Sequence, residues 1–208
     1  IEEGIIVTVE AVDIVDLTPP PDRSDAMTLF TYRSPTLAEI ASPLLKESIN
    51  LYGEAFMRLN TAKGAFPTND AALEGLHKRL AAWSLPDGSY QLVDGSGLSR
   101  RDAISPDAVM MVLQRMSDPS GKSRFLAALP IAGVDGSPGT RMKGTAAEGN
   151  LRAKTGTMSN IRTLAGYVTA RNGEHLAFAV FVNNFEGTGA AANQALDAIG
   201  VRLAEFTR

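Results

Sequence analysis

Apolar side chains recur at helical spacing through the first half of the chain, interrupted by short polar breaks. Thr36 and Glu39 have the spacing of a capping box, and apolar residues follow on one helical face. This pattern pauses at Ser48-Ile49-Asn50 and then resumes, which predicts two helices joined by a polar kink. A third helix is predicted over about residues 69–83. A fourth begins at Ser105-Pro106, where serine can cap the helix and proline fits its first position.

Strand patterns take over towards the C-terminus. Short strands are predicted over residues 151–154, 164–170 and 175–183, and Asn172-Gly173 favours a tight hairpin because both residues tolerate positive φ. From Ala190 an amphipathic helix closes the chain. Helices first, then an antiparallel meander and a covering helix predict an α/β (α+β) sandwich, in which helices flank an antiparallel sheet.

The first 33 residues have a different character. A short strand is expected over residues 4–9, and Pro19-Pro20-Pro21 follows among several aspartates. Three consecutive prolines fit neither a helix interior nor a central strand, so this stretch is interpreted as a connector. One main domain is therefore expected over residues 34–208, preceded by a tail and linker over residues 1–33.

Composition narrows the classes of function. The 208 residues include 20 basic and 23 acidic side chains, and a net charge of −3 gives no electrostatic surface for nucleic acid or anionic membranes. No apolar run is long enough to span a bilayer. The absence of cysteine excludes a disulfide scaffold and a cysteine nucleophile, and two histidines without cysteine do not favour a metal site. No metal or cofactor is expected.

Two short motifs carry candidate chemistry. Lys154-Thr155-Gly156-Thr157 falls where a strand begins, and offers a positive charge, hydroxyl donors for a carboxylate and a glycine that lets a substrate approach the backbone. Such an edge strand can also pair with an extended peptide. Ser48 and Asn50 form a Ser-x-Asn element in the predicted kink. The two motifs are two thirds of the signature of penicillin-binding proteins and β-lactamases, in which lysine rather than histidine activates the serine.

Further stretches agree in order and approximate spacing. The chain resembles the D-alanyl-D-alanine carboxypeptidase/endopeptidase family, the class C low-molecular-mass penicillin-binding proteins, over about residues 34–208. The stretches that carry the resemblance are residues 34–37 with 46–54, 94–100, 129–137, 152–158 and 164–168. It implies a DD-peptidase/β-lactamase-like sandwich fold.

The resemblance also implies a function. A family member is a serine hydrolase that cleaves peptidoglycan peptides ending in D-Ala-D-Ala, or peptidoglycan cross-links, through an acyl-enzyme that water later hydrolyses. It binds β-lactam antibiotics when complete. A periplasmic or otherwise extracytoplasmic location follows from the same resemblance.

Roles for individual residues follow from the matching motifs. Ser48 is expected in the proton network between the nucleophilic serine and the leaving amine. Asn50 is expected to hold the substrate amide or the lysine that accompanies the nucleophilic serine in its motif. Lys154 is expected near the substrate carboxylate. Thr155 and Thr157 are expected to bind that carboxylate through their hydroxyls. The Thr157 backbone N–H is expected to form half of the oxyanion hole.

Three more residues are assigned to substrate binding. Gly156 is expected to leave the backbone of the strand open to the substrate. Met158 and Leu98 are candidates for the wall of the pocket that receives the substrate's side chain.

The chain departs from the family pattern in two ways. It contains no Ser-x-x-Lys motif, which carries the family's nucleophile. In the family that motif lies far upstream, separated from Ser-x-Asn by inserted domains. The chain is therefore expected to be a C-terminal part with an incomplete fold, which needs the N-terminal half of the same protein as a partner. Residues 1–33 would be the tail of an inserted domain. The second departure is Asp102, where the family commonly has asparagine.

Two alternatives stay open on the sequence. One is a non-catalytic module of the same fold that binds cell-wall peptides, and a Ser-x-x-Lys motif in the parent protein distinguishes the enzyme from this binder. The other is a β-lactamase, against which the stretches at residues 94–100 and 129–133 favour the peptidase branch.

Overall fold

Two compact units make up the chain, residues 1–34 and residues 35–208. The computed structural model describes residues 16–19, 22, 24, 27–61, 67–117 and 123–208. The strand predicted over residues 4–9 lies outside them, and the origin of the first unit as the tail of an inserted domain stays a prediction. Residues 27–34 have no regular secondary structure. Their exposed apolar side chains are Met27, Leu29, Phe30 and Tyr32.

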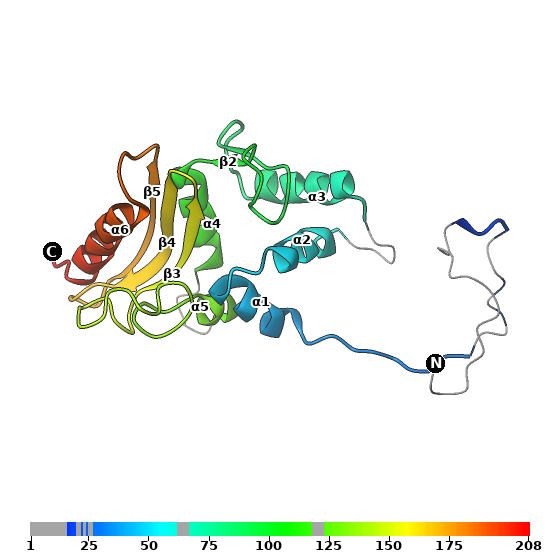
Figure 1. The fold of residues 1–208 in the computed structure, drawn as a ribbon, viewed down its shortest axis with the longest axis horizontal. Helices are drawn as coiled ribbons and strands as arrows, with labels where there is room; N and C mark the ends of the chain where they lie inside the picture. The colour runs from blue at the N-terminus through cyan, green and yellow to red at the C-terminus, as the bar shows by residue number, and fades with distance from the viewer. Residues whose placement is uncertain (1–15, 20–21, 23, 25–26, 62–66, 118–122) are drawn as a thin grey trace. The chain divides into compact units, whose positions relative to one another are not determined.

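Three helices open the larger unit: α1 (Leu37–Lys46), α2 (Asn50–Leu59) and α3 (Asn69–Ala82) (Figure 1). The capping box predicted at the start of α1 is confirmed, since the Thr36 hydroxyl accepts the Glu39 N–H and the Glu39 carboxylate accepts the Thr36 N–H. The predicted break between the first two helices is also confirmed. It contains Ser48, whose φ of 56° lies in the left-handed region and interrupts the helical run.

A two-stranded ladder and two further helices follow: β1 (Tyr90–Gln91), β2 (Ala103–Ile104), α4 (Pro106–Met116) and α5 (Arg124–Ala128). Ser105 caps α4 by accepting the Ala108 N–H, as predicted. A small apolar core around Leu80, Leu85 and Ala108 joins α3, the ladder and α4. The sequence pattern did not predict the ladder or α5, because such short segments carry too little periodicity.

The sheet has three antiparallel strands in the order β3 (Arg152–Met158), β4 (Ile161–Thr169) and β5 (His175–Asn183). Its last two strands agree with the prediction. The first is longer than predicted, because pairing continues through the Lys-Thr-Gly motif to a tight turn at Ser159-Asn160. Asn160 has a φ of 57°, which asparagine tolerates, and the turn sets a register in which Lys154 pairs with Ala165.

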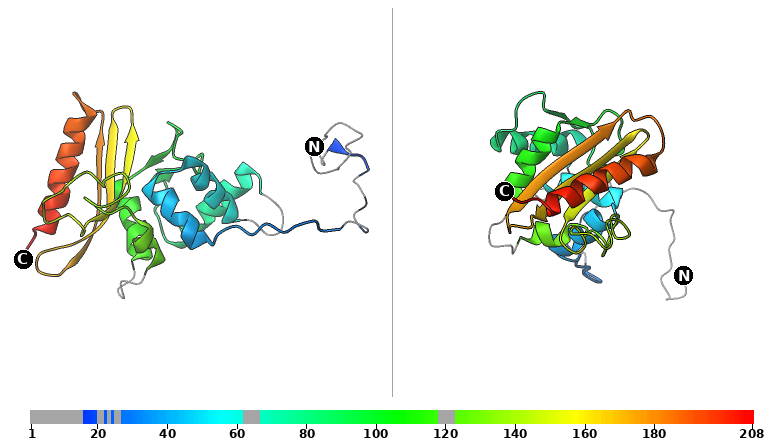
Figure 2. Two further views of the ribbon diagram at one scale, coloured as in Figure 1. Left: turned by 60° about the horizontal axis from the view of Figure 1, so that its bottom comes forward. Right: turned by 90° about the vertical axis from the view of Figure 1, so that its left-hand side faces the viewer.

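Helix α6 (Gly189–Ala204) covers one face of this sheet, and α4 packs against the other (Figures 1 and 2). The main apolar core lies between the sheet and α6, where Leu151, Leu164 and Leu196 are almost completely buried. Gly200 lets the helix approach closely, since a Cβ there would lie 2.8 Å from Leu151 Cδ1. The predicted α/β (α+β) sandwich with flanking helices is confirmed.

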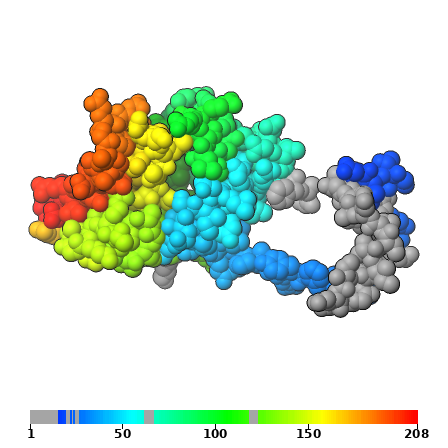
Figure 3. All heavy atoms as spheres, viewed as in Figure 1, coloured from blue at the N-terminus to red at the C-terminus, as the bar shows by residue number. Residues whose placement is uncertain are grey.

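The glycine-rich loop between α5 and β3 forms turns, as predicted, and lies against α1 (Figure 3). Side-chain ion pairs hold it on two sides. Arg141 pairs with Asp197 of α6 at 2.7 Å between Nη2 and Oδ1, and Lys46 at the end of α1 pairs with Asp135. In the described part of the chain, no helix is long and apolar enough to cross a membrane.

Candidate active site

Ser48 and Lys154 meet although 106 positions separate them in the sequence. Ser48 lies in the break between α1 and α2, and Lys154 lies on β3. The Lys154 Nζ donates to Ser48 Oγ at 2.9 Å and to the Thr155 carbonyl at 2.8 Å. The expected convergence of these two side chains is present in the fold.

Lys154 carries its charge in a partly desolvated place. Burial lowers the pKa of its ammonium from the ordinary value, because the charged form loses part of its water. Among the described residues, no carboxylate lies within ion-pairing distance of Nζ. Such a cation can attract a ligand carboxylate or exchange a proton with a neighbouring hydroxyl.

The glycine-rich loop fixes the Ser48 kink next to β3. Lys46, two residues before Ser48, pairs with Asp135 of this loop. Two residues further along the loop, Ser137 Oγ lies 2.6 Å from Thr155 Oγ1, and the two hydroxyls share a hydrogen bond. The loop therefore connects the end of α1 to the Lys-Thr-Gly strand.

Gly136 makes this connection sterically feasible. Its φ of 61° lies in the left-handed region, which favours glycine. A Cβ at this position would lie 2.8 Å from Pro130 Cβ and 3.1 Å from the Lys46 carbonyl oxygen. The structure thus explains the sequence Asp135-Gly136-Ser137. The Asp135 side chain binds the end of α1, the Ser137 side chain binds β3, and Gly136 makes the turn between them.

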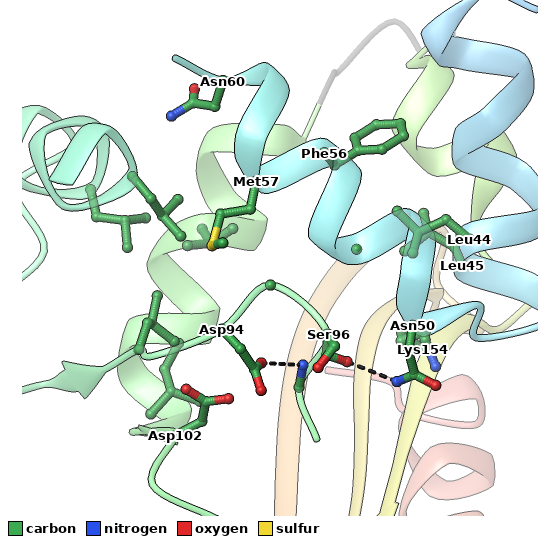
Figure 4. A pocket seen from close by; sticks show the side chains of 18 of the residues that line it. Leu44, Leu45, Asn50, Phe56, Met57, Asn60, Asp94, Ser96, Asp102 and Lys154 are labelled. Carbon is green, nitrogen blue, oxygen red and sulfur yellow. Dashed lines mark hydrogen bonds between the residues drawn. The ribbon is translucent and has the colours of Figure 1, made fainter. Parts of the chain in front are cut away.

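Asn50 joins Ser48 and Lys154 at a cleft of about 960 Å³ (Figure 4). It is the first residue of α2, and its Nδ2 donates to the Ser96 carbonyl at 2.8 Å. Its Oδ1 has no hydrogen-bond partner among the described residues, so this atom is available to a ligand. The structure therefore brings all three candidate catalytic side chains to one cleft.

Most of the cleft is apolar. Its walls come from the helices α1 to α4 and the ladder, and include Phe56, Trp83 and Met116. The polar groups Asn50 and Lys154 lie together at one end (Figure 4). A mainly apolar cavity with a few polar groups in its wall is typical of a site that orients its occupant.

The backbone of β3 presents alternate N–H groups to its open edge. Within the described sheet β3 pairs with β4, and the Ala153 N–H turns outward to donate to the Pro130 carbonyl at 3.0 Å. Because outward groups alternate along an antiparallel strand, the N–H groups of Thr155 and Thr157 share this direction. An extended peptide or a carbonyl oxygen can bind along this edge.

The other candidate residues lie along β3 and in the loop between β1 and β2. Thr157 is exposed, and a Cβ on Gly156 would lie 2.4 Å from Thr163 Oγ1 across the sheet. Met158 ends β3, and Leu98 is 64% exposed, but neither lines the cleft. Their assignment to a substrate pocket stays a prediction.

Two carboxyl groups organise the loop between β1 and β2. Asp94 accepts the N–H groups of Gly97 and Ser99 at 2.7 and 2.9 Å, and Asp102 accepts the Val93 N–H at 2.7 Å through Oδ1. Asp102 Oδ2 is buried without a hydrogen-bond partner among the described residues.

These surroundings shift the pKa values of the two carboxyl groups in opposite directions. Burial, with the nearby Asp94, raises the pKa of Asp102. Burial also opposes ionisation of Asp94, but its two N–H donors and Asp102 lower its pKa.

Sequence reasoning missed two contributors to this site. Glu54 of α2 accepts the N–H groups of Gly95 and Ser96. Its position four residues after Asn50, on the same helical face, is a signal that could have found it. The ion pair of Lys46 with a residue 89 positions away has no local signal.

Comparison with known families identifies the family to which the sequence belongs. The pattern that defines the D-Ala-D-Ala carboxypeptidase 3 (S13) family matches residues 3–206, almost the whole chain. The chain belongs to this family. The match also includes residues 3–33, which the motif resemblance left out. The family is one of hydrolases and carboxypeptidases, as the motifs implied.

One curated relative is the D-alanyl-D-alanine carboxypeptidase of Actinomadura sp. (strain R39). It is 38% identical over 193 residues, which are 90% of this chain but 35% of that protein. The chain spans little more than a third of the length of curated relatives that it matches.

Solved structures with low sequence identity share the fold of this family member. Penicillin binding protein 4 (dacB) from Haemophilus influenzae, in complex with a β-lactam, matches with a TM-score of 0.72 at 24% identity, over 81% of this chain and 41% of that chain. The extended-spectrum β-lactamase TLA-1 matches with a TM-score of 0.59 at 16% identity, over 81% of this chain and 63% of that chain. The predicted DD-peptidase/β-lactamase-like fold is therefore confirmed.

Proposed function

We propose that this chain is the C-terminal part of a serine D-Ala-D-Ala carboxypeptidase/endopeptidase that cleaves peptidoglycan stem peptides through an acyl-enzyme. The observation that carries the proposal is the hydrogen bond from Lys154 to Ser48 in a cleft that Asn50 also lines. A cation, a hydroxyl and an amide in one cluster suit acyl transfer, because together they can orient a carbonyl, stabilise charge and move a proton.

The attacking hydroxyl comes from outside this chain, since its 208 residues contain no Ser-x-x-Lys pair. In the complete enzyme, the serine of that motif attacks the carbonyl of the penultimate D-Ala while the motif's lysine accepts its proton. Ser48, hydrogen-bonded to Lys154, relays this proton from the motif's lysine to the amine of the terminal D-Ala as the peptide bond breaks, so that its own hydroxyl is unchanged afterwards. Water then hydrolyses the ester and restores the serine.

The terminal carboxylate of the substrate binds beside the Lys-Thr-Gly strand. Lys154 supplies the positive charge, and the hydroxyls of Thr155 and Thr157 donate hydrogen bonds to the carboxylate. The outward N–H of Thr157 and the N–H of the nucleophilic serine form the oxyanion hole. β-Lactams carry a carboxylate beside a reactive amide, and the same groups bind them.

The apolar part of the cleft receives the N-terminal half of the same protein. Side chains such as Phe56, Trp83 and Met116 form a surface that water solvates poorly, which favours cover by another apolar segment. A helix that carries the Ser-x-x-Lys motif and fills this cleft would bring its serine to the polar end, next to Ser48. Because the substrate is cell-wall peptide, the enzyme works outside the cytoplasm.

A non-catalytic module that binds cell-wall peptides is the second candidate. A parent protein that also lacks the Ser-x-x-Lys motif would favour this candidate, because the motif's absence from these 208 residues is expected of a C-terminal part as well. Such a module would bind peptides along β3 without forming an ester.

The test exposes the full-length protein to a fluorescent penicillin and to a peptide that ends in D-Ala-D-Ala. We expect a covalent adduct on the serine of the Ser-x-x-Lys motif and release of D-Ala. Lys154→Met should slow both reactions about 100-fold or more, as loss of a group that stabilises the transition state does. Lys78→Met, at an exposed position of α3, is the control and should change neither. Peptide binding without an adduct would favour the non-catalytic module.

A further inference from the structure

Glu54 holds the loop between β1 and β2 against α2, although it does not line the cleft itself. Its Oε1 accepts the Gly95 N–H at 3.0 Å and the Ser96 N–H at 3.1 Å. One carboxylate oxygen thus binds two successive N–H groups of the loop. Hydrogen bonds to a carboxylate are stronger than those to a neutral acceptor, so this contact restrains the Gly95–Ser96 peptide.

The next peptide unit along the loop, Ser96–Gly97, contacts Asn50. The Ser96 carbonyl accepts a hydrogen bond from Asn50 Nδ2 at 2.8 Å. Because a carbonyl oxygen can only accept, the nitrogen end of the Asn50 amide must face Ser96, and the oxygen end is left for a ligand (Figure 4). The position of the Ser96 carbonyl therefore decides which end of the amide a ligand meets.

Two glycines bring the loop and the helix close enough for these contacts. A Cβ on Gly95 would lie 2.7 Å from the Gly53 carbonyl oxygen and 2.8 Å from Met57 Cβ. A Cβ on Gly53 would lie 2.4 Å from the Gly95 carbonyl oxygen. Since neither position has room for a side chain, backbone packs directly on backbone, and Glu54 reaches the loop at hydrogen-bonding distance.

We propose that Glu54 is a positioning residue for acyl transfer, which orients the Asn50 amide by holding the backbone N–H groups of Gly95 and Ser96 and, through the Ser96 backbone, the carbonyl that Asn50 contacts. This inference rests on the function proposed above. Glu54 acts through two hydrogen-bonded steps, from its carboxylate to the loop and from the loop to Asn50. Loss of the first step allows the Ser96 carbonyl to shift and the Asn50 amide to turn, while the helix that carries both side chains stays in place.

The test compares Glu54→Ala and Glu54→Gln in the full-length protein, with kcat/KM for D-Ala release as the readout. Alanine removes both hydrogen bonds and should lower kcat/KM about tenfold, as expected for two bonds of modest net strength. Glutamine keeps an Oε1 that can accept both N–H groups, so its kcat/KM should stay within about twofold of wild type. Glu54→Asp withdraws the carboxylate by one methylene, so its kcat/KM should lie between those of the alanine and glutamine variants. If the alanine variant does not fold, the aspartate variant is compared with the glutamine variant instead.

The matched control is Glu148→Ala. Glu148 also accepts a backbone N–H, that of Gly144. Gly144 does not line the cleft, whereas Gly95 and Ser96, which Glu54 binds, do. We expect this variant to keep the wild-type kcat/KM even where its unfolding temperature falls as far as that of Glu54→Ala.

A double-mutant cycle separates positioning from general stabilisation. If Glu54 acts through Asn50, then Glu54→Ala should have little further effect in a protein that already carries Asn50→Ala. Additive losses, or a wild-type kcat/KM for both Glu54→Ala and Glu54→Asp, would overturn the inference. An inactive wild-type full-length protein would contradict the proposed function instead, so the two failures are distinguishable.

Discussion

The Lys154 ammonium donates to the Ser48 hydroxyl at 2.9 Å and to the Thr155 carbonyl at 2.8 Å, which directs two of its three protons within the fold. Ser48 reaches this position from a kink whose backbone adopts a φ of 56°. Lys154 reaches it from an edge strand whose register is set by a tight turn. The contact therefore depends on two elements that lie 106 positions apart in the sequence, and a change in the backbone of either should lengthen the distance from Lys154 Nζ to Ser48 Oγ.

Thr155→Val should weaken turnover in the full-length enzyme and leave the fold intact. The two side chains are similar in size, but valine cannot donate a hydrogen bond to the substrate carboxylate. Loss of one charge-assisted hydrogen bond costs about 1.5–3 kcal/mol, so kcat/KM should fall by roughly 10- to 160-fold. Steady-state kinetics at subsaturating peptide measure this change.

Ser137→Ala is the control for that experiment. It removes the 2.6 Å contact between Ser137 Oγ and Thr155 Oγ1 but keeps the threonine hydroxyl for the substrate. We expect a smaller loss than in Thr155→Val. Equal losses would assign the effect to the attachment of the glycine-rich loop rather than to the substrate carboxylate.

The difference in stability between wild type and Lys154→Met should depend on pH, because Lys154 is partly buried. Burial lowers the folded-state pKa of Lys154 below its ordinary value of 10.5, so the folded chain releases this proton at a lower pH than the unfolded chain does. The contribution of Lys154 to stability is therefore present above 10.5 and is lost as the pH falls through the folded-state pKa. The free energy of unfolding of wild type minus that of Lys154→Met should rise from neutral pH towards pH 10.5. A difference that stays constant in denaturant titrations across this window would contradict the lowered pKa.

Asp102→Asn should stabilise the fold at neutral pH. Burial and Asp94 raise the folded-state pKa of Asp102 above 3.8, so its contribution to stability is present in acid and is lost as the pH rises through that raised pKa. Asparagine keeps an oxygen that can accept the Val93 N–H and adds a permanent N–H donor beside Asp94. The gain in unfolding temperature over wild type should be largest near neutral pH and should shrink in acid.

Asp87→Asn is the matched control for the change of charge, because Asp87 is an exposed aspartate in the same region of the chain. It should shift the unfolding temperature little at any pH. If Asp102→Asn gave the same small shift, Asp102 would have no special interaction with Asp94.

Local sequence patterns were sufficient to predict most helices and strands of the fold. Thr36 and Glu39 predicted where α1 begins, because a capping box depends on residues three positions apart. Asn172-Gly173 predicted the hairpin between β4 and β5 for the same reason, since the connection over residues 170–174 is closed by local hydrogen bonds, among them that of the Gly173 N–H to the Ala170 carbonyl. The length of β3 was not predicted, because pairing with β4 extends the strand through Gly156, a residue that disfavours strands by itself.

Only the motif residues of the candidate site could be predicted from the sequence. Resemblance placed Ser48, Asn50 and Lys154 in one site, and the structure brings them to one cleft. The contacts that hold them there have no such signal, because Glu54 binds the backbone of residues more than forty positions away. Backbone N–H groups look alike in every sequence, so a side chain that binds them can be found only in the folded chain.

The 208-residue chain by itself should form no covalent adduct with penicillin. Acylation needs a hydroxyl whose proton a neighbouring base accepts, and the serine of the Ser-x-x-Lys motif is absent from the sequence. Ser48 is the best substitute, but its neighbour Lys154 donates a hydrogen bond to it and is charged below its own pKa, so it cannot also take the proton. The open apolar cleft should also make the isolated chain prone to association.

Intact-protein mass after incubation with penicillin measures the adduct, with and without the N-terminal half supplied as a second chain. We expect an unchanged mass for the 208-residue chain in both samples, and an adduct of one penicillin on the N-terminal half when the two are combined. The same mixture with Lys154→Met should acylate far more slowly, because the cleft then lacks the cation that attracts the carboxylate of penicillin. A stable adduct on the isolated chain, mapped by peptide sequencing to Ser48, would show that this chain carries a complete active site and that the missing serine is not needed.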